Sequence, residues 1–167
     1  MIAAALLAPG TACAATGDIG CIETKLGSAA MERIGQGVVM AADNGTDPAR
    51  ALDADRDALL PARDACRTAG NWSPDAIQIA VSYTQGRATK LGAESALKRD
   101  GLDPAMLSAS YAALPVQDRR SLVAKASSGA LNAVAVATPR IAPRRHVVLY
   151  LAALAAIEFY PADFAAA

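Results

Sequence analysis

Three residue pairs, each a helix-capping residue followed by proline, divide this chain into helices. They are Asp47-Pro48, Ser73-Pro74 and Asp103-Pro104. The side-chain oxygen of a cap accepts a hydrogen bond from the first helical turn. Proline is tolerated at the next position because its missing N–H would have no partner there. Stop signals stand shortly before the pairs, at Asn44-Gly45, Gly70-Asn71 and Gly101, where a preceding helix would end.

These signals and the apolar periodicity predict the positions of the helices. We expect helices over about residues 19–43, 48–69 and 74–100, a fourth from Pro104 that breaks at Leu114-Pro115 and continues over about 116–137, and a last one from about Pro143. In the third helix the buried face is expected at Ile77, Val81, Thr84, Ala88, Leu91 and Leu97. Gly86 and Gly92 in the same helix indicate close packing against another helix.

The last predicted helix is the most apolar part of the chain. It is apolar on every side from His146 to Ile157, so we expect it at the centre of the bundle. Its eleven apolar residues over 147–157 are too few to span a bilayer, which needs about 20. The predicted fold is therefore all-α and without a transmembrane span. We expect a single domain over residues 15–167, a bundle of five to six mostly antiparallel helices with short loops.

Composition agrees with a helical fold and excludes one class of partner. Hydrophobic residues make up 53% of the 167 residues and aromatic residues only 4%, because alanine supplies about a quarter of the chain. Alanine is the best helix former. The formal net charge is zero, so the chain lacks the positive charge typical of nucleic-acid binders. We expect no nucleic-acid partner.

The start of the chain has features of an export signal. Residues 2–8 are apolar, and Ala12-Cys13-Ala14 matches the small-residue site at which such signals are cleaved. The basic n-region is missing, since the first cation is Lys25, so one alternative is an alanine-rich tail. Another is a lipoprotein, in which Cys13 carries the lipid. We interpret residues 1–14 as a signal-peptide remnant and expect a periplasmic or secreted protein.

Removal of that segment would leave two cysteines, Cys21 and Cys66. In an exported chain a pair indicates one disulfide, whereas in a cytosolic chain the same residues would be buried thiols. If the first two predicted helices form a hairpin, Cys21 lies level with residues near Gly70, and Cys66 is about 6 Å away along the helix axis. Because a disulfide joins Cα atoms about 4.4–6.8 Å apart, the sequence predicts a Cys21–Cys66 bond.

An aspartate-rich segment has part of the pattern of a calcium-binding loop. The acids are Asp53, Asp55, Asp57 and Asp64. Such a loop needs glycine at its sixth position, where this chain has Ala58, and it normally ends in glutamate. We interpret the segment as the solvated face of a helix, and expect no metal or other cofactor.

Catalytic candidates are few. Ser95 and Lys98 match the S-x-x-K motif in which lysine activates a serine, but the motifs that accompany it are absent. Glu94-Ser95 on a helix is a pattern that also occurs in enzymes that cleave peptidoglycan, but the other elements of those enzymes are absent from this sequence. His146 is the only histidine, and we interpret it as a structural residue at the start of the last helix. The sequence indicates a protein that is not an enzyme.

Cations gather toward the end of the chain. Residues 116–146 contain Arg119, Arg120, Lys125, Arg140, Arg144 and Arg145 against the single acid Asp118. Arg144 and Arg145 fall at the start of the last helix, where the helix dipole disfavours cations. Either they pair with the acid-rich residues 43–64, or the five arginines bind an anionic partner.

Three functions follow from these observations. The leading hypothesis is an exported, non-enzymatic helical protein that acts by binding. The first alternative is a peripheral envelope protein that binds anionic lipid or polymer through the basic residues 119–145. A weaker alternative is a hydrolase of the cell envelope. Neither the ligand nor the partner is specified by the sequence.

Overall fold

The computed structural model describes residues 15–46, 55–124 and 145–167, apart from the side chain of Ala124. Six helices make up this part of the chain, and no strand occurs in it. They are α1 (Cys21–Asp43), α3 (Arg56–Gly70), α4 (Pro74–Arg99), α5 (Pro104–Ala112), α6 (Val116–Ala124) and α8 (Arg145–Ala165). The predicted all-α fold is confirmed.

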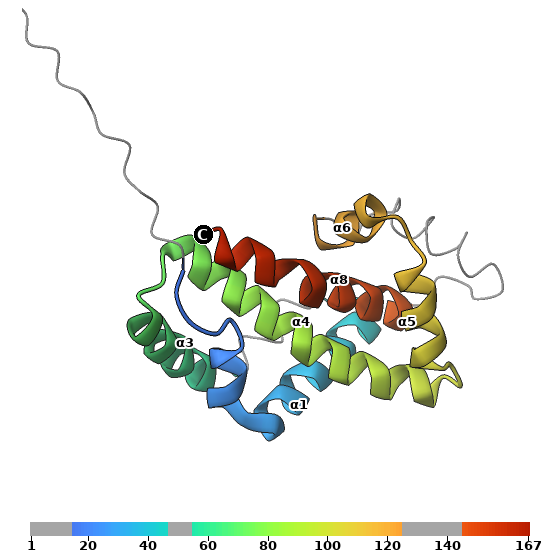
Figure 1. Cartoon of the computed structure of the whole chain (residues 1–167). Helices are drawn as coiled ribbons and strands as arrows, with labels where there is room; N and C mark the ends of the chain where they lie inside the picture. Colours follow the sequence, from blue (N-terminus) through green and yellow to red (C-terminus); the bar gives the residue numbers. More distant parts are fainter. Residues whose placement is uncertain (1–14, 47–54, 125–144) are drawn as a thin grey trace, which may run out of the picture.

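Two long helices form the middle of the bundle. α4 and α8 lie side by side and run in opposite directions (Figure 1), and they share the most extensive contact in the fold. α1 packs against α4, and α3 packs mainly against α1, while α5 and α6 lie against α8. The last helix is therefore central, as expected, but it shares that position with α4.

The cap-proline pairs within the described residues start helices as predicted. The Ser73 hydroxyl accepts a hydrogen bond from the Ala76 N–H at 3.0 Å, and α4 begins at Pro74. The Asp103 carboxylate accepts one from the Ala105 N–H at 2.9 Å at the start of α5. The break at Leu114-Pro115 separates α5 from α6. The pair Asp47-Pro48 and the predicted helical residues 125–137 lie outside the described residues.

The helix predicted over about residues 19–43 is present as α1, but one non-helical residue interrupts it. α1 starts at Cys21 and is interrupted at Gly27, whose φ of 74° and ψ of 168° are not helical. Glycine adopts this positive φ without steric cost because it has no Cβ. The interruption therefore divides α1 into a short first turn, which carries Cys21, and a longer helix that packs on α4.

The buried face of α4 consists mainly of small residues. Fully buried positions include Ala76, Ala80, Ala88, Ala93 and Ala96. The predicted stripe is wrong at Leu91, which is 40% exposed, and Ile77 and Val81 are only half-buried. Small residues prevail on this face because α1 and α8 approach α4 closely on either side, and Leu97 is the large side chain that is fully buried there, as predicted. The prediction of close packing at Gly86 and Gly92 is confirmed, since a Cβ at either glycine would collide with the neighbouring helix.

A disulfide joins α1 to α3. The Cα atoms of Cys21 and Cys66 are 5.9 Å apart, so the predicted bond is confirmed. Beside it, the Trp72 ring meets the Phe164 ring edge to face, with 5.1 Å between centroids. The Trp72 indole N–H donates to the Thr16 carbonyl oxygen at 2.9 Å. One apolar cluster therefore ties the start of α1, the end of α3 and the end of α8 together.

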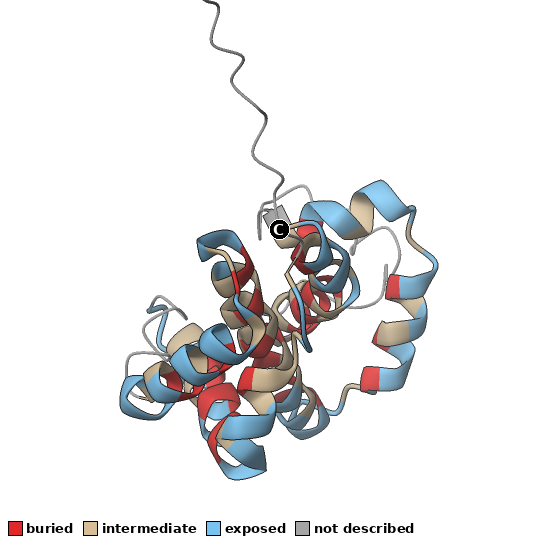
Figure 2. Ribbon diagram, turned by 60° about the vertical axis from the view of Figure 1, so that its left-hand side comes forward, coloured by how far each residue is buried: buried red, intermediate tan, exposed pale blue. Residues whose placement is uncertain are grey.

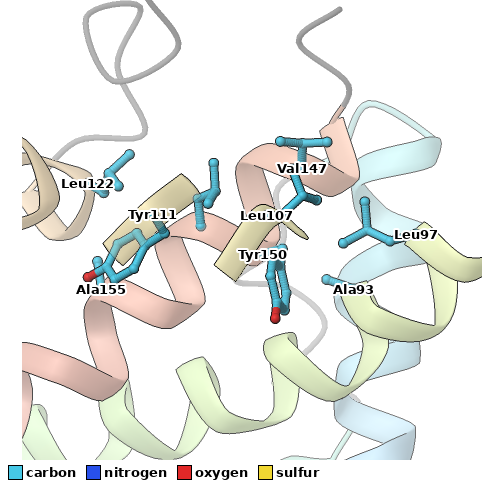
Figure 3. Close-up of a cluster of buried hydrophobic side chains, with 9 residues drawn as sticks. Ala93, Leu97, Leu107, Tyr111, Leu122, Val147, Tyr150 and Ala155 are labelled. Atoms are coloured by element: carbon cyan, nitrogen blue, oxygen red, sulfur yellow. The ribbon is translucent and has the colours of Figure 1, made fainter. Parts of the chain in front are cut away.

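A second apolar cluster lies at the other end of the central helix pair. Its members include Leu97 of α4, Leu107 and Tyr111 of α5, and Val147 and Leu151 of α8. Figure 3 shows Leu107, Tyr150 and Val147 of this cluster side by side between the helices, and in Figure 2 the residues coloured as buried lie on the sides of the helices that face one another. α5 is held in place mainly by this cluster, because only one side of this short helix is buried.

α8 is longer than the predicted apolar segment 147–157. It has 21 residues, and by length and composition it is the one described helix apolar enough to cross a membrane. The core helix of a soluble bundle meets the same test. Here α8 packs against α1, α4, α5 and α6, and 39% of its most apolar window is buried. Its carboxylates Glu158 and Asp163 pair with arginines of α6.

Candidate functional site

A pocket of about 210 Å³ opens between the two central helices. We call it the α4–α8 pocket, and residues from four helices line it, among them Val38 of α1, Gln85 and Gly86 of α4, Leu122 of α6, and Ala153 and Tyr160 of α8. Val38, Leu122 and Ala153 are buried, whereas Gln85 and Tyr160 are partly exposed. The pocket therefore has an apolar interior and a partly polar entrance.

Small residues create this pocket. A Cβ at Gly86 would lie 2.8 Å from the Cβ of Ala156, so α4 and α8 touch where both have minimal side chains. Ala152 and Ala153 follow on the α8 side and leave space that larger residues would fill. The sequence pointed to Gly86 as a packing residue, but it gave no signal for a pocket, because the lining residues come from helices far apart in the chain.

Among the described residues, no charged side chain lines the α4–α8 pocket. Its polar groups are the hydroxyls of Ser82, Thr89 and Tyr160 and the amide of Gln85. Burying an ion without a partner is costly, whereas hydroxyls and amides can bind an uncharged polar group. The pocket is therefore suited to a small neutral molecule with one hydrogen-bonding end.

One wall of the pocket is held by two arginines of α6. Arg119 forms an ion pair with Glu158 at 3.0 Å, and Arg120 forms one with Asp163 at 2.6 Å. The Arg120 guanidinium also lies over the Phe159 ring, 5.0 Å from its centroid. These contacts fix α6 on α8 and thereby place Leu122 and Val123 at the pocket.

A tyrosine of α5 completes this arrangement. The Tyr111 hydroxyl donates to Glu158 Oε2 at 2.5 Å, and Arg119 lies over the Tyr111 ring. Burial raises the pKa of Tyr111 above its ordinary value, and the neighbouring Glu158 carboxylate raises it further. Tyr111 therefore remains a neutral hydrogen-bond donor to Glu158 over a wide pH range.

The structure places three of the five candidate anion-binding arginines in internal contacts. Arg119 and Arg120 pair with α8, and Arg145 donates to the carbonyl oxygens of Ala42 at 2.6 Å and Asp43 at 3.1 Å. Arg145 thus meets the negative end of the α1 dipole, which offsets its unfavourable position at the start of α8. Arg140 and Arg144 lie outside the described residues. An anionic lipid or polymer would have to compete with these internal partners.

His146 lies at the start of α8, as expected, between two carboxylates. Its Nε2 is 2.9 Å from Asp43 Oδ1, and its Nδ1 is 3.0 Å from Asp100 Oδ2. The side chain is 12% exposed. One indirect signal for this contact is present in the sequence, since both aspartates stand at predicted helix ends.

The residues of the S-x-x-K motif lie at a second pocket, of about 330 Å³, between α1 and α4. Ser95, Lys98 and Glu94 line it together with Glu32 of α1. The Ser95 hydroxyl donates to the carbonyl oxygen of Leu91 at 3.2 Å, within its own helix.

Glu94 itself is held by two neighbours. It forms an ion pair with Lys90 at 2.5 Å, and the Tyr150 hydroxyl lies 3.5 Å from it. Burial and the negative charge of Glu94 raise the pKa of Tyr150. The structure therefore brings Ser95, Lys98 and Glu94 to one surface, and it places a second carboxylate, Glu32, beside them.

The aspartates of the possible calcium loop are dispersed. Asp55 precedes α3 and pairs with Arg33 at 3.2 Å, while Asp64 pairs with its neighbour Arg63 at 2.7 Å. Asp57 is exposed in the first turn of α3, and Asp53 lies outside the described residues. Among the described residues, no group of three or more side chains is placed to hold a metal ion.

Comparison with known proteins gives no relative from which a function could be transferred. No family model, curated protein or solved structure matches this chain. The pockets and charged contacts described above are therefore the basis for inferring its function.

Proposed function

We propose that this protein is an exported, non-enzymatic binding protein that takes a small uncharged molecule into the α4–α8 pocket. The observation that carries the proposal is the lining of this pocket, to which the described residues contribute an apolar interior, four hydroxyl or amide groups and no charged side chain. Small-molecule sites commonly combine an apolar cavity with a few polar groups that orient the ligand. Export is supported by the Cys21–Cys66 disulfide, because such bonds persist in oxidising compartments.

The volume limits the size of the ligand. An apolar cavity of about 150 Å³ binds benzene, which has six non-hydrogen atoms. A pocket of about 210 Å³ therefore holds a molecule of roughly eight such atoms. One end of the ligand lies on the buried alanines of α8, and the other reaches the hydroxyl or amide groups of α4 and Tyr160. A short-chain amide or alcohol has this chemistry.

A charge series tests this proposal. Hexanamide, hexanoate and hexylamine have the same chain length but carry a neutral, a negative and a positive head group. Chemical shifts of the lining methyl and amide groups, followed during titration, should saturate with hexanamide at millimolar concentration. The two charged probes should bind at least tenfold more weakly, because the described lining residues offer them no counter-ion. Equal binding of all three probes, or none, would contradict the proposal.

Two matched variants show whether binding occurs in this pocket. Ala152→Leu adds a large side chain at the pocket lining, whereas Ala162→Leu adds the same side chain at an exposed position of the same helix. Hexanamide binding should be lost in the first variant and kept in the second. Far-UV circular dichroism of both variants checks that the fold is unchanged.

One observation favours a second candidate, a hydrolase of the cell envelope. Glu32 and Glu94 both line the second pocket, and glycosidic bonds are cleaved between two carboxylates. Release of soluble fragments from purified peptidoglycan, abolished by Glu32→Gln and by Glu94→Gln, would support this candidate. Fragment release that persists in both variants, or no release by the native protein, would exclude this use of the pocket.

A further inference from the structure

Three helix ends meet at His146. Asp43 is the last residue of α1, Asp100 caps the end of α4, and His146 lies in the first turn of α8. The imidazole ring touches both aspartates, which are 46 and 103 residues away from it in the chain. α1, α4 and α8 are the three longest described helices and form most of the bundle. The His146 side chain joins them at one corner of the bundle, where α1 and α4 end and α8 begins.

The geometry at this corner depends on the number of protons on the ring. Both ring nitrogens lie within 3.0 Å of a carboxylate oxygen. An ionised carboxylate accepts hydrogen bonds but donates none, and a neutral imidazole has only one N–H. Only the doubly protonated ring can donate to Asp43 and Asp100 together. In the neutral ring, one nitrogen lone pair would face a carboxylate oxygen, which is repulsive.

We propose that His146 is a proton-dependent clasp that fixes the start of α8 to the ends of α1 and α4. The imidazolium closes the clasp, and loss of its proton releases one of the two carboxylates. Histidine changes charge between about pH 5 and 8, so a rise in pH through this range loosens the corner. The contribution to stability is thus present at the acidic side of this range and lost at the alkaline side.

The charged groups around the ring are consistent with this clasp. Asp43 faces the ring from α1 and Asp100 from α4, while Arg145 lies beside it on α8. The C-terminal ends of α1 and α4 favour the imidazolium and the guanidinium through their dipoles. Since Arg145 keeps its charge, α8 stays attached to α1 when the clasp opens. We expect the opening to loosen the first turns of α8 without unfolding the bundle.

The protein's single histidine makes the first test direct. The ¹⁵N chemical shifts of the imidazole in the native protein report how many ring nitrogens carry a proton at each pH. Both nitrogens should be protonated at pH 5.5, and one should lose its proton on the way to pH 8. A ring that is already neutral at pH 5.5 would overturn the proposal.

Hydrogen exchange tests the structural consequence. After correction for the intrinsic effect of pH, protection of the amides of Leu149, Tyr150 and Leu151 should fall about tenfold between pH 5.5 and 8, the effect expected from losing one hydrogen bond between charged groups. In His146→Gln, which does not titrate, protection should be the same at both pH values. Equal pH dependence in the native protein and in this variant would refute the clasp.

A second variant keeps the test decisive if His146→Gln does not fold. In Asp43→Asn, the new amide can donate to the neutral ring while the ring donates to Asp100, so the pH dependence should shrink. Asp57→Asn, which changes an exposed carboxylate in the first turn of α3, is the control and should keep the full effect. An undiminished pH dependence in Asp43→Asn would count against the clasp.

Discussion

Gly35 of α1 and Gly92 of α4 face each other where the two helices cross, and neither position has room for a Cβ. A Cβ on Gly92 would overlap the carbonyl of Gly35, and one on Gly35 would overlap the carbonyl of Ala88. The two backbones are therefore in direct contact. This contact sets the distance between α1 and α4 and buries Met31 and Ile34 beside it.

Replacing Gly92 by alanine tests this contact. Alanine gains about 1 kcal/mol of helix propensity over glycine, but overlap in a packed interior costs about 1–3 kcal/mol. Because the overlap here is with rigid backbone, we expect Gly92→Ala to lower the free energy of unfolding by about 2 kcal/mol overall. Urea unfolding followed by circular dichroism measures the change. Ser95→Ala, on the exposed side of the same helix, should stay within about 0.5 kcal/mol of the native value.

Breaking the disulfide should lower the free energy of unfolding by more than Gly92→Ala does. Cys21 and Cys66 are separated by 45 residues, and closing a loop of this length stabilises a fold by about 4 kcal/mol in the chain-entropy description. Reduction with a thiol reagent should lower the free energy of unfolding by this order of magnitude. The double variant Cys21→Ala/Cys66→Ala should resemble the reduced protein and should not respond to reductant. A native protein equally stable with and without reductant would show that the bond adds nothing.

The contact between Trp72 and Phe164 can be followed by fluorescence, because Trp72 is the only tryptophan. Phe164→Ala removes a buried ring and should lower the free energy of unfolding by about 3 kcal/mol. It should also shift the emission of Trp72 to longer wavelength, since water would reach the indole ring. Phe159→Ala removes a half-buried ring from the same helix, away from Trp72, and should leave the emission unchanged.

The raised pKa of Tyr111 predicts that the protein loses stability at alkaline pH. Its pKa is higher in the folded protein than in the unfolded chain, so the unfolded chain loses the phenolic proton first. Stability due to Tyr111 is therefore complete below about pH 10 and declines as pH rises above that value. Tyr111→Phe should show a smaller loss of stability between pH 9 and 11 than the native protein. The same measurement on Tyr83→Phe corrects for the loss of a phenol elsewhere.

The sequence predicted those features of the fold that depend on local chemistry. Ser73-Pro74 and Asp103-Pro104 start helices because a cap and a proline act within one turn. The Cys21–Cys66 bond followed from helix length and one turn position. Both predictions needed only the geometry of single helices or of one hairpin.

The features that the sequence did not predict depend on how the helices pack. Leu91 fits an apolar stripe of α4, yet it is 40% exposed, because the close approach of α1 at Gly92 favours small residues on the buried side. The α4–α8 pocket combines residues of four helices, and none of them is unusual by itself. His146 meets two aspartates that the chain brings near only after folding.

α3 contributes little buried apolar surface for its length. Its buried side chains are Leu59, Ala62 and Cys66, and the last of these is covalently bound to α1. Ordering a residue costs about 1–2 kcal/mol of entropy, which three buried side chains offset only in part for a helix of 15 residues. We therefore expect assembly to occur in two stages, with α3 added last. The last step of folding would then be the oxidation of Cys21 and Cys66 by an external oxidant. This reaction, rather than apolar collapse, would determine when α3 is fixed in place.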